Sequence, residues 1–139
     1  MIDKKSIEQL IQEARQAQKN AYAPYSQFTV GAAALGIDGN VYKGCNVENA
    51  SYGLTICAER NAMFHGAACG CYEFPWLAIV GDSQDYTLPC GACRQVMAEF
   101  HVQHVVLTKP DNTYTIVSLQ QLLPYCFELE SGGIHGEEI

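Results

Sequence analysis

The sequence has few charged residues, and basic ones are especially scarce. Only 17% of its residues are charged, and 8 Lys and Arg stand against 15 Asp and Glu. The resulting net charge of −7 argues against a nucleic-acid polymer as partner. No run approaches the roughly 20 apolar residues of a membrane span, and no apolar signal segment follows Met1–Lys5. We therefore expect a cytoplasmic protein that binds neither nucleic-acid polymers nor membranes.

Internal repeats, low-complexity tracts and linkers are also missing. A chain of 139 residues has the length of one domain. We expect a single domain over 1–139, in which 131–139 form a mobile acidic tail. The charged fraction lies below the ~25% of typical globular chains, which indicates that part of the surface is covered in a homo-oligomer.

Helical and strand-like patterns alternate along the chain. The expected helices cover 6–22, 57–66, 90–101 and 118–123, and the expected strands cover 28–37, 41–46, 76–80, 104–108 and 113–117. Ser6 and Gln9 fit a capping box at the start of the first helix, and Asp38-Gly39 fits a hairpin turn. This order predicts an α/β fold, a three-layer α/β/α sandwich with a mixed five-stranded sheet. Such sheets bind ligands where strands lead through loops into helices.

Seven cysteines are many for a chain of this size. In a reducing compartment they favour metal binding or catalysis over disulfides. Cys90 and Cys93 are three residues apart at an expected helix start, so their sulfurs share one face and suit a tetrahedral zinc. By itself this pair fits a thioredoxin-type redox site equally well. Cys57, at a second expected helix start, favours the metal.

Three protein ligands leave one zinc position open, which is the catalytic arrangement. Glu59 follows Cys57 by two residues, where a carboxylate could move protons for a zinc-activated water. Arg60 and Arg94 each follow a cysteine closely, and an arginine bonded to the thiolates would offset their charge. A closed structural site would need a fourth cysteine, and the remaining ones belong to no second paired motif at a helix start: Cys45, Cys69, Cys71 and Cys126.

The two cysteine segments read Cys57-Ala58-Glu59 and Pro89-Cys90-Gly91-Ala92-Cys93. They match the H-x-E…P-C-x-x-C pattern of zinc deaminases in its three-cysteine variant. Further matching segments follow the same order along the chain: Tyr22–Ser26, Phe28–Ala32, Gly44–Asn49 and Leu122–Pro124. Over nearly its whole length the chain thus resembles the small three-cysteine cytidine deaminases that act on free nucleosides.

The resemblance implies a role for each matching residue. It implies that one Zn²⁺ per chain is bound by Cys57, Cys90 and Cys93, that Glu59 shuttles protons, and that Arg60 bonds the zinc thiolates. It also implies a homotetramer in which a neighbouring subunit completes each site. The implied substrate contacts are the Phe28 ring and the Ala58 backbone for the base, Asn46 and Glu48 for the ribose, and Tyr52 and Phe127 from the neighbouring subunit.

The implied reaction is the hydrolytic deamination of cytidine and 2′-deoxycytidine to uridine and 2′-deoxyuridine, with release of ammonia, in pyrimidine salvage. A zinc-activated water would attack carbon 4 of the ring while Glu59 moves the protons. One alternative is a deaminase of another aminopyrimidine nucleoside, such as blasticidin S. A non-enzymatic zinc-binding module would need a closed four-ligand site, and a redox protein would leave Cys57 and Glu59 unexplained.

Overall fold

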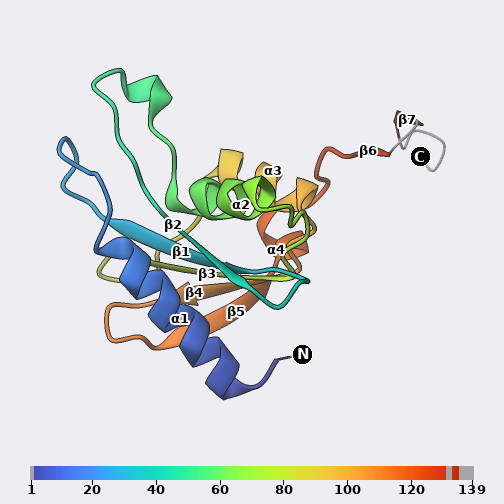
Figure 1. The fold of residues 1–139 in the computed structure, drawn as a ribbon, viewed down its shortest axis with the longest axis horizontal. Coiled ribbons are helices and arrows are strands. Elements are labelled where there is room, and N and C mark those ends of the chain that lie inside the picture. The colour runs from blue at the N-terminus through green and yellow to red at the C-terminus, as the bar shows by residue number, and fades with distance from the viewer. Residues whose placement is uncertain (1, 131–132, 135–139) are drawn as a thin grey trace.

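A mixed five-stranded sheet forms the middle layer of the computed structural model, which describes residues 2–130 and 133–134 (Figure 1). The strands lie in the order β2-β1-β3-β4-β5. Neighbouring β3 and β4 are parallel, whereas the other three pairs are antiparallel. The strand bounds are β1 (Val30–Leu35), β2 (Val41–Cys45), β3 (Trp76–Gly81), β4 (His104–Thr108) and β5 (Tyr114–Ser118). The predicted α/β/α sandwich is confirmed.

Helices cover both faces of the sheet (Figure 1). On one face lies α1 (Lys4–Gln18), and on the other lie α2 (Ala58–Ala68), α3 (Gly91–Glu99) and the short α4 (Leu119–Leu122). Alternate residues of the strands therefore enter two separate apolar cores, which explains why β3 is buried along its whole length. Among the described residues, no helix is both long and apolar enough to span a bilayer.

The first helix begins two residues before its predicted start. Its N-cap is Asp3, whose side chain accepts a hydrogen bond from the Ser6 amide at 2.8 Å, so the predicted Ser6–Gln9 capping box is wrong. An aspartate three residues upstream caps this amide equally well. The helix ends at Gln18 rather than at 22, because the Tyr22 amide donates instead to the Asn46 carbonyl.

Three short elements were not predicted: a 3-10 turn, η1 (Tyr52–Leu54), and the strands β6 (Leu129–Glu130) and β7 (Gly133–Ile134). The two strands pair with each other, and two residues of the predicted mobile tail thus belong to an antiparallel ladder. The rest of that predicted tail, 131–132 and 135–139, lies outside the described residues.

The close contact between α2 and β2 depends on a residue without a side chain. A Cβ added at Gly44 would lie 2.2 Å from the Ala62 nitrogen and 2.5 Å from the Ala58 oxygen, both of them backbone atoms of α2. Since α2 begins directly after Cys57, this contact also sets how far the Cys57 thiol and Glu59 lie from the sheet.

We expect Gly44→Ala to lower the free energy of unfolding by about 1–3 kcal/mol, because backbone must move to admit the added methyl group. Urea denaturation measures the change. Gly53→Ala is the matched control, since a Cβ there meets no heavy atom within 4 Å, and its stability should stay near that of the wild type. Wild-type stability in Gly44→Ala would contradict the close approach of helix and strand.

Candidate active site

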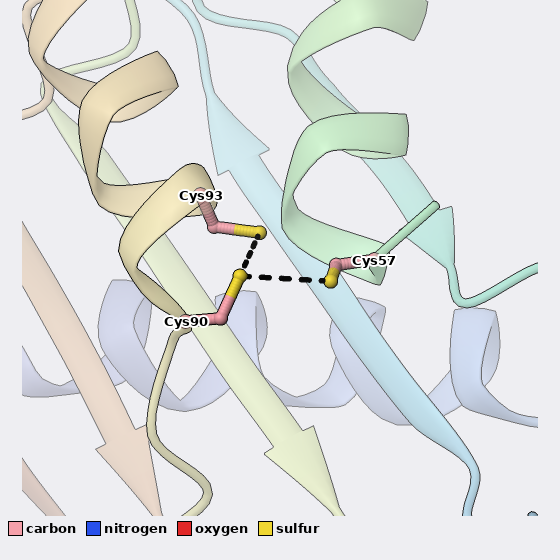
Figure 2. Close-up of side chains that lie close together, drawn as sticks. All are labelled: Cys57, Cys90 and Cys93. Carbon is pink, nitrogen blue, oxygen red and sulfur yellow. Dashed lines mark hydrogen bonds between the residues drawn. The ribbon is translucent and has the colours of Figure 1, made fainter. Parts of the chain in front are cut away.

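Three cysteine sulfurs converge where two helices begin (Figure 2). Cys57 is the N-cap of α2, Cys90 is the N-cap of α3, and Cys93 lies in the first turn of α3. Neither N-cap side chain makes a capping hydrogen bond, so both sulfurs are directed to the cluster instead. The Sγ atoms of Cys57 and Cys90 are 3.8 Å apart, and those of Cys90 and Cys93 are 3.5 Å apart.

These separations fit one zinc ion. Thiolates on a tetrahedral zinc, with Zn–S bonds of about 2.3 Å, lie about 3.8 Å from each other. All three sulfurs lie within 4.8 Å of one another, and no fourth ligand residue joins them in the part of the chain that the structure describes. Cys71, one of the rival ligands, instead donates to the Glu73 carbonyl. Three ligands with a free fourth position correspond to a catalytic rather than a structural zinc site.

Electrostatics around the sulfurs favour a bound cation. Hydrogen bonds from Cys93 and Arg60 lower the pKa of the Cys57 thiol to about 5, against the opposing effect of burial. The Arg60 Nη2 donates to Cys57 Sγ at 3.5 Å, and this bond raises the pKa of Arg60. The hydrogen bond between Cys93 and Cys57, together with burial, raises the pKa of the Cys93 thiol. Both helix N-termini add positive potential, which favours the thiolate form of the cluster.

Arg94 does not touch the sulfurs. Its Nε donates to the Pro89 carbonyl at 2.9 Å, and its Nη1 donates to the Leu122 carbonyl at 2.7 Å. Arg94 therefore fixes the loop that precedes Cys90 and joins it to α4. Of the two arginines considered from the sequence, Arg60 is the one that contacts a thiolate.

Glu59 lies beside the thiolates at the start of α2, and its side chain is only 4% exposed. Burial raises the pKa of this carboxyl to about 7, although a hydrogen bond with its own backbone lowers the pKa, and the nearby Cys57 thiolate adds a smaller upward effect. The residue lines a cavity of about 260 Å³ together with Cys57 and Cys90. A carboxyl group in this position can exchange protons with a molecule held in the cavity.

The same cavity brings together residues from distant parts of the sequence. Phe28, Asn46 and Ala58, all predicted to bind substrate, contribute to its wall. Five further lining residues were not predicted: Val30, Thr55, Ser83, Thr87 and Leu88. Three of these, from Ser83 to Leu88, follow the carboxyl end of β3, where ligands of α/β sheets bind, and that rule could have identified them.

Glu48 and Tyr52 line a neighbouring cavity of about 350 Å³, whose wall shares Thr55 with the first. The Glu48 carboxylate accepts hydrogen bonds from the Tyr25 and Ser26 amides at 2.9 and 3.1 Å and from the Ser26 hydroxyl. These bonds lower the pKa of Glu48, the Ser26 hydroxyl having the largest effect. In this chain, Glu48 therefore holds the 23–28 loop next to the cavity, and its contact with a ribose stays a prediction.

Phe127 lies away from the Glu59 cavity of its own chain. It is 65% exposed and lines a separate cavity beside α3, where Gln95 Nε2 donates to the Phe127 carbonyl at 2.8 Å. Tyr52 is 74% exposed and meets Tyr25 edge to face at 5.8 Å. Phe127 can thus act in a Glu59 cavity only if another copy of the chain provides that cavity, as the resemblance implies.

An α/β/α sandwich with a Cys-x-Glu and a Cys-x-x-Cys segment at two helix starts defines a class of zinc-dependent deaminases. A family model described as the cytidine and deoxycytidylate deaminase zinc-binding region matches residues 4–109. The chain belongs to this family, and the resemblance stated from the motifs is confirmed. The three-cysteine cluster fits one zinc per chain.

Individual relatives agree over most of the chain. A cytidine deaminase of Sporosarcina psychrophila is 45% identical over 126 residues, which cover 89% of this chain and 93% of the relative. The crystal structure of a cytidine deaminase from Burkholderia pseudomallei superposes with a TM-score of 0.83 at 46% identity, covering 91% of this chain and 100% of that one. A cytidine deaminase structure from Mycobacterium tuberculosis gives a TM-score of 0.78 at 41% identity, covering 93% and 100%.

Proposed function

We propose that this chain catalyses the hydrolytic deamination of cytidine and 2′-deoxycytidine to uridine and 2′-deoxyuridine, with release of ammonia. The observation that carries the proposal is the placement of Glu59, a buried carboxyl in the wall of a cavity that also holds Cys57 and Cys90 of the thiolate cluster. Relatives named cytidine deaminase, at 45% and 47% identity, support the same reaction.

The chain's own residues account for the proton movements. Cys57, Cys90 and Cys93 would hold a zinc ion, which would lower the pKa of a water molecule and make it a nucleophile at neutral pH. Glu59 accepts a proton from the attacking water as the water oxygen adds to carbon 4 of the cytosine ring. Glu59 then delivers this proton to ring nitrogen 3. Glu59 then carries the second proton to the exocyclic amine, which leaves as ammonia. One water is consumed for each ammonia released, and Glu59 ends in its starting state.

The lining of the cavities favours an uncharged nucleoside over a nucleotide. Phe28 offers a ring for packing against the pyrimidine, and Asn46 and Glu48, the proposed ribose contacts, line the two cavities. Among the described residues, neither of these two cavities is lined by Lys or Arg, whereas phosphate recognition uses such cations. We therefore expect deoxycytidylate, which carries a phosphate, to be a poor substrate.

A panel of aminopyrimidines tests the substrate class. The ultraviolet absorbance of cytidine, 2′-deoxycytidine, deoxycytidylate and blasticidin S is followed separately after mixing with the purified protein. We expect the two nucleosides to be deaminated with kcat/KM at least about tenfold above that of the other two compounds. Faster conversion of blasticidin S or deoxycytidylate than of cytidine would contradict the proposed substrate.

The proposal extends to assembly and location. We propose one domain over 1–139 that forms a homotetramer, in which Tyr52 and Phe127 reach the active site of a neighbouring subunit. Their exposed side chains and the distance of Phe127 from its own cavity support this arrangement. None of the seven cysteines forms a disulfide, which fits the reducing cytoplasm that we propose for this protein and its role in pyrimidine salvage. Sedimentation equilibrium should give the mass of four chains, and a fully active monomer would contradict the shared site.

A further inference from the structure

Phe28, the proposed contact for the pyrimidine, lies just outside the sheet. Strand β1 begins at Val30, which pairs with Gly81 of β3. Before it, Gln27 adopts a positive φ of 58°, and this turns the chain out of the strand direction. The backbone groups of Phe28 and Thr29 therefore need hydrogen-bond partners other than the ladder.

On the β2 side, the Asn46 side chain bonds to the backbone at both ends of this segment. Its Nδ2 donates to the Phe28 carbonyl at 2.8 Å, and its Oδ1 accepts from the Val30 amide at 2.9 Å. The Phe28 amide donates to the Ser26 hydroxyl oxygen at 3.0 Å. One edge of the segment is thus held by side chains that follow the end of β2 or lie in the preceding loop.

On the β3 side, the partner is Asp82, the residue that follows directly after β3. Continuing the antiparallel register by one residue from the Val30–Gly81 pair sets Thr29 opposite Asp82. Here the carboxylate takes the place of the backbone ladder, because its Oδ2 accepts from both the Thr29 amide and the Thr29 hydroxyl at 2.8 Å. Gln18, at the end of α1, donates to the Thr29 carbonyl at 3.1 Å and to Asp82 Oδ1 at 3.3 Å.

Asp82 also joins two walls of the active-site cavity. One wall contains Phe28 and Val30, on either side of the Thr29 that Asp82 holds, and the other contains Ser83, the residue after Asp82. A shift of the Asp82 carboxylate would therefore move the Phe28 ring relative to the loop that leads to Cys90.

We propose that Asp82 is a positioning residue of this enzyme, which sets the place of the Phe28 ring against the substrate base through the backbone of Thr29. The inference rests on the proposed function, because it takes Phe28 as the contact for the pyrimidine. Asp82 touches neither the zinc ligands nor the reacting atoms in this role. Its effect is on nucleoside binding, which is made in the ground state and the transition state alike.

The test is the separate measurement of KM and kcat for cytidine in Asp82→Ala. Loss of both bonds to Thr29 should raise KM about tenfold, whereas kcat should change by less than about threefold and zinc should stay at one per chain. Asp82→Asn keeps one acceptor oxygen for the Thr29 amide and should restore most of the affinity. The matched control is Asp85→Asn, which removes an exposed carboxylate from the same loop without contact to Thr29 and should leave KM unchanged.

Amide hydrogen exchange separates a failure of this proposal from a failure of the proposed function. In the absence of substrate, a peptide that spans Phe28–Val30 should exchange faster in Asp82→Ala than in the wild type. Unchanged exchange, or faster exchange with an unchanged KM, would overturn the positioning role. A wild type that does not deaminate cytidine would overturn the proposed function, and the exchange rates would still test the anchoring. If Asp82→Ala does not fold, Thr29→Val removes the hydroxyl bond alone and should give a smaller rise in KM.

Discussion

Glu59→Gln should reduce kcat for cytidine by roughly 10²–10⁴-fold, which is the contribution expected of general acid–base catalysis. The amide has nearly the shape of the carboxylate but cannot accept and return a proton at neutral pH. Glu59 lies buried in the cavity wall beside two of the proposed zinc ligands, and among the described residues no other carboxylate lines this cavity. Zinc content and the affinity for the product uridine should stay close to wild-type values, since neither depends on proton transfer.

Steady-state kinetics by ultraviolet absorbance, with zinc quantified in the same samples, gives the comparison. Glu8→Gln is the matched control, because it makes the same chemical change on the exposed face of α1, on the opposite side of the sheet. Its activity should equal that of the wild type. Turnover near the wild-type level in Glu59→Gln would show that the protons move through another group.

Cys93→Ser should remove zinc and reduce activity by about three orders of magnitude or more, because a metal-free site no longer lowers the pKa of the attacking water. Serine has the size of cysteine, but its hydroxyl does not ionise near neutral pH and is a poor zinc ligand. The Cys93 side chain is fully buried beside Cys90. A cysteine on the protein surface therefore cannot reach this position and replace Cys93 as a ligand.

Metal analysis after dialysis against a weak chelator measures the loss directly. Thermal unfolding gives a readout independent of activity, since added zinc should raise the unfolding temperature of the wild type and not that of Cys93→Ser. Cys69→Ser serves as control, because Cys69 is an exposed free thiol outside the cluster, and it should retain both zinc and activity. A zinc-replete, active Cys93→Ser protein would contradict the assignment of the ligands.

The zinc cluster could be predicted from the sequence because its information is local. A spacing of three residues at a helix start places two sulfurs on one face, and Cys57 carries its glutamate two residues later. The structure brings these two short segments together as expected, with the N-caps at Cys57 and Cys90. The α/β/α sandwich with a mixed sheet also followed from local patterns, because helices that alternate with strands indicate a sheet covered on both faces.

The support of the substrate pocket could not be predicted in this way. The Phe28–Thr29 segment is held by side chains that are 11 and 53 residues from Thr29 in the sequence, Gln18 and Asp82. Such contacts depend on how the strands align, and no local spacing encodes them. Similarly, the start of α1 depended on which of two nearby polar residues capped it, a choice between Asp3 and Ser6 that differs little in free energy.

One zinc held by three thiolates is proposed to enable this chain to deaminate cytidine. The most direct test removes the metal with a chelator, returns zinc in steps, and follows cytidine absorbance and bound zinc in the same sample. We expect activity to be absent without metal, to rise in proportion to bound zinc, and to reach its maximum at one zinc per chain. Full activity in the metal-free protein, or a zinc-loaded protein that leaves cytidine unchanged, would contradict it.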